Sequence, residues 1–259
     1  MKHLFVSFLR NSPPIFNIVI QIYYFIQPIH IKELVLGSRA RDKDWETKTL
    51  HKGNDWGGKS TDWIDSYWES RNHSHRKFLV NRISTYKPES ILEIGCNCAP
   101  NLYLLAKKFP DIEITGIDIN PMVIDRGLDY LHSEKVYNVR LQVYNLKELA
   151  KCPSKYFDVV FTDSVLIYVH PKEIRETIKQ MIRIAKRSVI MLERYDTNLL
   201  GVYRYGCWER DYVGILKQFI NEKQISLTKI TSNEWDEERW KKTGVLVEAR
   251  LSDEKIPLS

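Results

Sequence analysis

The chain has 259 residues, a formal net charge of +6, 43% apolar residues and 28% charged residues. These values fit one large globular domain, or one domain with an appendage, and exclude a disordered chain, a collagen-like chain and a polytopic membrane protein. Most of the basic excess lies in residues 1–84, so the remainder is close to neutral. Because the sequence has no clustered run of Arg and Lys, its charge gives little support for a nucleic-acid partner.

The N-terminal segment is apolar and almost uncharged. No charged residue stands in residues 11–31, although Pro, Asn and Gln interrupt the apolar stretch 15–29. Three interpretations stay open: a helix packed on the domain or on another subunit, an interfacial membrane anchor, and a membrane span. The anchor would give peripheral membrane contact through residues 10–32. No small-residue cleavage site follows, which argues against a signal peptide.

The four cysteines predict reduced thiols. Cys96 and Cys98 stand too close in sequence for a good disulfide, and no second close pair completes a zinc site with them. The other two, Cys152 and Cys207, are isolated. We therefore expect a cytoplasmic protein without a metal centre.

Two segments precede the regular part of the chain. Residues 38–62 are polar and aperiodic, which predicts a linker or lid-like loop. Apolar spacing then predicts one helix over about 62–86. His73 and His75 would point to different faces of that helix, so we expect no metal pair there.

From residue 90 onward, short apolar runs alternate with helical stretches. This alternation predicts a doubly wound, mostly parallel α/β sheet. A helix is expected over about 208–221, followed by an antiparallel pair of strands, 225–230 and 245–251, at the sheet edge. The preceding strands are predicted at 91–94, 112–117, 139–143, 157–161 and 188–192.

Two strand ends carry the residues that predict a ligand site. The first predicted strand runs through Glu93 into Gly95, and the second ends at Asp118. Ligands of such sheets bind at the carboxyl ends of the strands, where Gly95 permits close approach and Asp118 can accept ribose hydroxyl hydrogen bonds. A turn glycine and a helix-capping aspartate are the ordinary structural alternatives.

The chain resembles class I S-adenosylmethionine-dependent methyltransferases over about residues 84–193. That family's first motif is an acidic residue followed by Gly-x-Gly-x-Gly, which here reads EIGCNCA over residues 93–99, with Asn97 and Ala99 in place of two glycines. The segments GIDINP and FDVVFTDSVLIYVHP continue the resemblance. It implies a Rossmann-like, seven-stranded sheet with an antiparallel last strand over residues 85–259, after an N-terminal helical extension (1–37) and a linker with a helix (38–84).

The resemblance also implies cofactor contacts. Residues of the first motif lie against the methionine part of S-adenosylmethionine, the second strand end binds ribose, the third contacts adenine, and the fourth faces the methyl group. From the residues themselves, Arg76 or Arg71 is a candidate partner of the cofactor carboxylate. The corresponding residues are Glu93, Gly95, Cys96 and Asn97 for methionine, Asp118 for ribose, Ile119, Asn145 and Leu146 for adenine, and Asp163 for the methyl group.

Candidates for catalysis follow the fourth predicted strand. Methyl transfer requires an aligned nucleophile, and a hydroxyl nucleophile usually also requires a general base. Asp163, Tyr168 and His170 are the candidates. Histidine is the residue type that most often serves as a general base, but His170 also precedes a proline and could simply begin a helix.

We expect methyl transfer to a small molecule or a glycan or lipid-linked intermediate, with oxygen as the favoured atom. An RNA or protein methyltransferase and a non-catalytic cofactor-binding subunit are the alternatives. TDSV stands at 162–165 instead of an Asn-Pro-Pro-Tyr-like motif, which weighs against methylation of base amines. The acceptor and the oligomeric state stay open.

Overall fold

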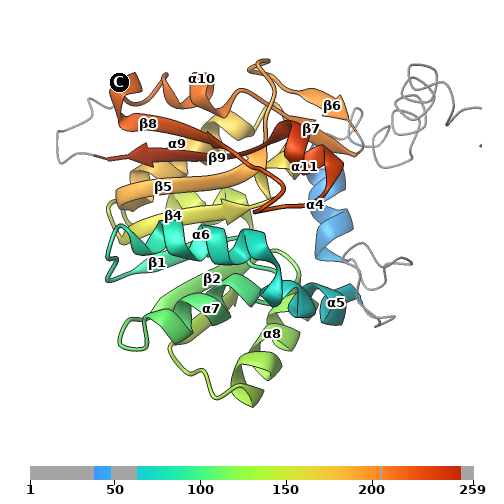
Figure 1. Ribbon diagram of the computed structural model, residues 1–259, viewed down its shortest axis with the longest axis vertical. Helices are drawn as coiled ribbons and strands as arrows, with labels where there is room; N and C mark the ends of the chain where they lie inside the picture. Colours follow the sequence, from blue (N-terminus) through green and yellow to red (C-terminus); the bar gives the residue numbers. More distant parts are fainter. Residues whose placement is uncertain (1–37, 48–62, 205, 252–259) are drawn as a thin grey trace, which may run out of the picture.

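The computed structural model describes residues 38–47, 63–204 and 206–251 (Figure 1). The expectations for residues 1–37, including membrane contact through 10–32, lie outside this part of the chain. Within the described part, no helix is both long and apolar enough to cross a membrane.

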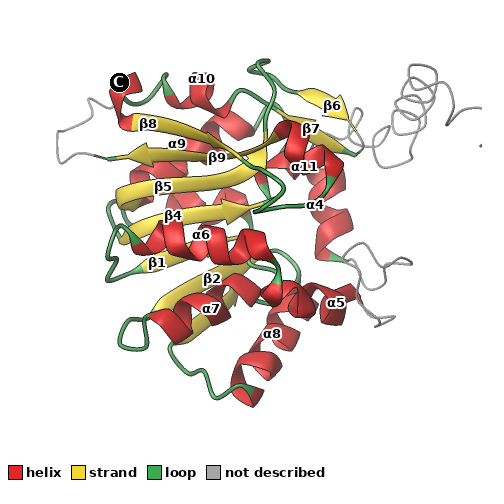
Figure 2. Ribbon diagram, viewed as in Figure 1, coloured by secondary structure: helices red, strands yellow, loops and turns green. Residues whose placement is uncertain are grey.

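Seven strands form one sheet in the order β3-β2-β1-β4-β5-β9-β8 (Figures 1 and 2). The first five strands of the chain pair in parallel, whereas β9 is antiparallel to both β5 and β8. This confirms the predicted doubly wound sheet and its antiparallel C-terminal pair. The strands are β1 Ile91–Ile94, β2 Ile114–Asp118, β3 Val139–Val143, β4 Phe157–Asp163, β5 Ala185–Arg194, β8 Ile225–Lys229 and β9 Gly244–Arg250.

The central strands are buried on both faces. Every residue of β1 and β4 is buried, which explains why both read as nearly continuous apolar runs rather than as alternating patterns. The polar exceptions are Glu93 in β1, and Asp158, Thr162 and Asp163 in β4. Of these, Asp163 ends its strand at the carboxyl edge of the sheet, where the predicted site lies.

Helices cover both faces of the sheet. Apolar side chains of α6 Ser74–Ser84, α7 Pro100–Lys108, α8 Pro121–Ser133 and α11 Glu238–Thr243 form the core on one face. Those of α9 Ile174–Ile184 and α10 Tyr212–Leu216 form the core on the other. Figure 1 shows α6 and α7 in front of the sheet and α9 behind it.

The predicted helix over 62–86 is two helices. α5 Trp63–Glu69 and α6 are separated by a 3-10 turn, Ser70–Asn72, and by an extended residue, His73, with ψ of 144°. Buried Arg76 stabilises this break, because its Nε donates to the backbone oxygen of Ser70 at 3.1 Å. His73 therefore stands outside the helix, so the expected opposite orientation of His73 and His75 is wrong.

The predicted helix over 208–221 is also largely wrong. Strand β6 Val202–Arg204 pairs with β7 Cys207–Glu209, and only the short α10 follows. Arg210 accounts for this local structure: it is fully buried, and its guanidinium donates to the backbone oxygens of Leu166 and Val169. These contacts tie the segment after β7 to the 3-10 turn Leu166–Tyr168.

The segment 38–62, which was expected to be a loop, begins with a helix, α4 Ser38–Glu46. It is held by tertiary contacts with three parts of the fold. The Trp45 ring lies 4.9 Å from that of Tyr168, Asn120 Nδ2 donates to the Trp45 backbone oxygen at 2.9 Å, and Lys147 pairs with Asp42 at 2.8 Å.

Candidate functional site

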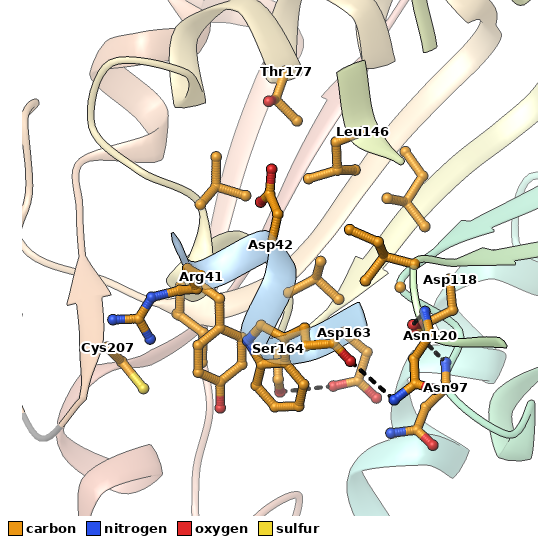
Figure 3. Close-up of a pocket in the computed structure, with 18 of the residues that line it drawn as sticks. Arg41, Asp42, Asn97, Asp118, Asn120, Leu146, Asp163, Ser164, Thr177 and Cys207 are labelled. Atoms are coloured by element: carbon orange, nitrogen blue, oxygen red, sulfur yellow. Dashed lines mark hydrogen bonds between the residues drawn. The ribbon is translucent and has the colours of Figure 1, made fainter. Parts of the chain in front are cut away.

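A cavity of about 1180 Å³ lies at the carboxyl ends of the parallel strands (Figure 3). Its wall includes Gly95, Asp118, Asn145 and Asp163, which follow or end β1, β2, β3 and β4. Sites for a single small ligand usually occupy roughly 300–1,000 Å³. This cavity therefore has room for a cofactor together with a small acceptor.

The turn after β1 keeps its shape without the usual glycines. Gly95, Asn97 and Ala99 all take positive φ angles, of 71°, 49° and 68°. Backbone N–H groups of Gly95 and Cys96 both donate to the Ile117 backbone oxygen, at 2.7 and 3.0 Å. The left-handed conformations that the family's glycines favour are thus present here at all three positions.

Gly95 is the position that tolerates no side chain. A Cβ atom there would lie 2.4 Å from Cγ2 of Val165, and the backbone has positive φ. Asn97 is among the residue types that adopt this region most readily. The turn therefore depends on glycine only where Val165 approaches it.

Asp118 is held in place at the end of β2. Its Oδ2 accepts from the Asn97 backbone N–H at 2.9 Å, and its Oδ1 accepts from the Asn120 backbone N–H at 3.0 Å. Burial raises its pKa, and these backbone hydrogen bonds oppose the shift. Asn120, not Asp118, caps α8, because its side chain accepts from the Met122 backbone N–H. Asp118 keeps further acceptor positions on the cavity wall.

The predicted adenine residues also line the cavity. Ile119, Asn145 and Leu146 all stand on its wall. Asn145 has a local task as well, because its Oδ1 accepts from the Lys147 backbone N–H at 2.9 Å and caps a 3-10 helix, Leu146–Lys151. Its contact with adenine stays a prediction.

Two residues of the first motif lie behind the wall. Glu93 is 2% exposed, and its Oε1 accepts from Asn101 Nδ2 at 2.7 Å. Burial raises the pKa of Glu93 well above its ordinary value and likewise that of the Cys96 thiol. Neither side chain reaches the cavity, whereas Gly95 and Asn97 do.

Arg76 is also buried behind the wall. Its Nη1 lies 3.1 Å from Asp163 Oδ2, and Nη2 donates to Ser70 Oγ at 2.7 Å. The guanidinium thus faces Asp163 and the turn before α6 rather than the cavity. This buried position of Arg76 does not support the expected contact between its guanidinium and a cofactor carboxylate.

Asp163 lies on the wall at the centre of a buried polar network. Its Oδ2 accepts from His75 Nε2 at 3.2 Å, Arg76 Nη1 at 3.1 Å and Asn101 Nδ2 at 3.0 Å. Burial alone would raise its pKa, but His75, Arg76 and Asn101 more than offset that effect and hold the pKa well below its ordinary value. A carboxylate so strongly ionised is a poor general base.

The other two candidates for catalysis differ in position. Tyr168 lines the cavity, but Cys207 beside it and burial raise its pKa well above the ordinary value, so the phenol stays protonated. His170 lies off the cavity wall. Its Nδ1 accepts from the Lys172 backbone N–H at 3.2 Å, which is the role of a helix-start residue.

Sequence reasoning missed the contributions of α4 and of His73 to the wall. Arg41 and Trp45 of α4 line the cavity, as does His73. Figure 3 shows Asp118, Asn97 and Asn120 on one side, Arg41 and Cys207 on the other, and Asp163 between them. The turn residues Ser70 and Asn72 were the available signal that His73 leaves the helix.

Comparison with known proteins finds similarity to methyltransferases. Residues 91–188 match the family model described as a methyltransferase domain. A methyltransferase of Strobilurus tenacellus, str3, is 31% identical over 111 residues, which are 40% of this chain and 37% of that protein. The malonyl-(acyl-carrier protein) O-methyltransferase of a Paenibacillus species (strain JDR-2) is 27% identical, over 41% of this chain and 40% of that protein.

The chain thus matches only about two-fifths of the length of these curated relatives. The structure of magnesium protoporphyrin IX methyltransferase from Synechocystis PCC 6803, with bound S-adenosylmethionine, superposes with a TM-score of 0.58 and 12% identity. The match covers 83% of this chain and 97% of that one, and it shows a shared fold. Residues 91–188 of this chain thus match a methyltransferase domain, and the chain shares the fold of a methyltransferase solved with bound S-adenosylmethionine.

Proposed function

We propose that this protein transfers a methyl group from S-adenosylmethionine to an oxygen atom of a small molecule or of a glycan or lipid-linked intermediate. The observation that carries the proposal is the position of Asp118 beside the left-handed turn over residues 95–99 on the cavity wall. The relative named as an O-methyltransferase supports oxygen as the acceptor atom.

The wall residues fit the chemistry of the cofactor. Asp118 offers acceptor lone pairs to ribose hydroxyls, and Ile119 and Leu146 offer apolar surface to a flat base. Ionised Asp163, on the same wall, suits a positively charged sulfonium. When bound, S-adenosylmethionine supplies an electrophilic methyl group attached to that sulfonium.

The remaining wall suits an acceptor with a ring. Aromatic side chains of Trp63, Tyr67, Tyr168 and Trp235 line the cavity, and Arg41 adds a positive charge. Flat aromatic faces pack well against sugar rings and aromatic rings. The proposed acceptor enters this space while the chain's own residues hold its nucleophilic oxygen in line with the methyl group.

Calorimetric titration of the full chain with S-adenosylmethionine tests the cofactor assignment. Asp118→Ala should weaken binding at least tenfold, because the ribose loses a charged acceptor. Asp125→Ala, an exposed aspartate on α8, is the matched control and should leave affinity unchanged. A folded wild-type protein that binds neither S-adenosylmethionine nor S-adenosylhomocysteine would overturn the proposed function.

We also propose the division 1–37, 38–84 and 85–259 and a cytoplasmic protein that contacts membranes through residues 10–32. The uncharged apolar stretch and the flanking basic residues Arg10 and Lys32 support this contact. Full-length protein should pellet with anionic liposomes more than a chain starting at Ser38. Equal pelleting of the two would reject the membrane contact and leave the methyltransferase proposal intact.

A further inference from the structure

Three side chains, Asp163, His75 and His73, form a continuous chain of contacts that begins and ends on the cavity wall. Asp163 Oδ2 lies 3.2 Å from His75 Nε2, and His75 Nδ1 lies 2.6 Å from His73 Nδ1. His75 is fully buried, and its ring stacks on that of Trp235 with centroids 3.9 Å apart and an interplanar angle of 18°. His73 is half-buried and lines the cavity.

The hydrogen bonds determine which ring nitrogens carry protons. Ionised Asp163 can only accept, so Nε2 of His75 is the donor. Burial lowers the pKa of His75 to about 4, so the ring is neutral at pH 7 and its Nδ1 has no proton.

The contact of 2.6 Å then requires a proton on Nδ1 of His73. The backbone N–H of His75 also points at that atom, but at 3.4 Å it is a much weaker competitor. A neutral His73 with its proton on Nδ1 has its free lone pair on Nε2, the ring nitrogen that does not contact His75.

We propose that His73 is the general base of the methyl transfer, and that His75 and Asp163 are positioning residues that fix its tautomer and orientation. The inference rests on the proposed function, because it assigns a base to that reaction. In the transfer, the acceptor oxygen bonds to the methyl carbon while its proton passes to Nε2 of His73. The electron pair of the broken carbon–sulfur bond stays on sulfur, and the proton on His73 is then lost to solvent.

The surroundings of His73 keep it available as a base. Burial and the positive charge of Arg76 lower its pKa, and the negative charge of Asp163 partly opposes them. Asp236 and Glu237, from the segment before α11, line the same cavity and add negative charge. His73 is therefore mostly unprotonated at neutral pH, unlike Tyr168, which keeps its proton, and His170 lies off the wall.

Nitrogen NMR of the full chain labelled with ¹⁵N-histidine tests the positions of the imidazole protons and does not require the methyl acceptor to be known. Signals are assigned by their loss in His73→Gln and His75→Gln, with His132→Gln on the exposed face of α8 as the control. We expect the proton on Nδ1 of His73 and on Nε2 of His75 at pH 7.5. The opposite tautomer at His73 would overturn the inference.

Chemical modification gives a second readout. Diethyl pyrocarbonate reacts with unprotonated imidazole, so peptide mass spectrometry should find His73 modified and buried His75 unmodified, with His132 as the exposed reference. An unreactive His73 under conditions that modify His132 would contradict the assignment. His73→Gln should keep its affinity for S-adenosylmethionine within about twofold. Failure of the His73 assignment would therefore leave cofactor binding intact, whereas failure of the proposed function would show as a wild-type protein that does not bind the cofactor.

Discussion

Arg76 and Asp163 form an ion pair in which both side chains are almost completely buried. Nη1 lies 3.1 Å from Oδ2, and the side-chain exposures are 0% and 2%. Arg76 comes from α6 and Asp163 from the end of β4, so the pair joins the segment before the sheet to the cavity wall. The attraction offsets the cost of burial only while both charges are present.

Replacing Arg76 by Met should therefore destabilise the fold strongly. The change leaves the buried Asp163 carboxylate without its positively charged partner, although His75 and Asn101 still donate to it, at a cost of about 3–5 kcal/mol in the free energy of unfolding. Urea denaturation measures the effect. Arg140→Met is the control, because Arg140 pairs with Glu113 at the surface and should contribute less than about 1 kcal/mol. An equal decrease in the free energy of unfolding for both variants would show that the buried pair contributes no more than a surface pair.

Gly95→Ala should abolish cofactor binding. The added Cβ would clash with Val165, and φ at this position is 71°, so the turn must move. Calorimetry with S-adenosylmethionine measures the loss. Ala99→Gly, in the same turn, should bind normally, since glycine accommodates the φ of 68° there without strain. Tight binding by folded Gly95→Ala would show that the turn is not part of the site.

Variants of Asn120 should distinguish the two hydrogen-bonding roles of its side chain. Its oxygen caps α8, and its Nδ2 donates to the Trp45 backbone oxygen of α4. Asn120→Ala loses both and should cost about 1–2 kcal/mol in stability. Asn120→Asp keeps the cap but not the donor. Hydrogen exchange should then accelerate in α4 and not in α8, and unchanged exchange in α4 would show that the Asn120 contact does not hold it.

Stability should depend on pH through Glu193. Burial raises its pKa to about 7, although Thr162 and the backbone N–H groups of Val165 and Leu166 oppose the shift. The folded state then binds more protons than the unfolded state between about pH 4.5 and 7. Stability should therefore fall as pH rises through this window, by up to about 3 kcal/mol.

Glu193→Gln checks that assignment. The variant loses the titrating group, so its free energy of unfolding should vary less between pH 5 and pH 8, whatever its absolute stability. Urea denaturation of both proteins at matched pH values gives the two slopes. Identical slopes would assign the pH dependence to other groups.

The parts of the fold that follow from local periodicity could be predicted. The buried strands read as apolar runs, and parallel pairing necessarily brings Gly95, Asp118 and Asp163 to one edge of the sheet. Helix α4 could not be predicted, because its sequence SRARDKDWE has no apolar stripe and contacts from Trp45 and Asp42 hold it. The break at His73 likewise depends on Arg76, six residues beyond Ser70 and bound to its backbone oxygen.

The turn over residues 95–99 has a consequence for how related proteins are found. Its shape is maintained by hydrogen bonds to Asp118 and to the Ile117 backbone oxygen, with asparagine and alanine at positions usually given to glycine. A search that counts glycines would pass over such chains. In this chain the dihedral angles of the turn, together with Asp118 at the end of β2, mark the candidate site where the number of glycines does not.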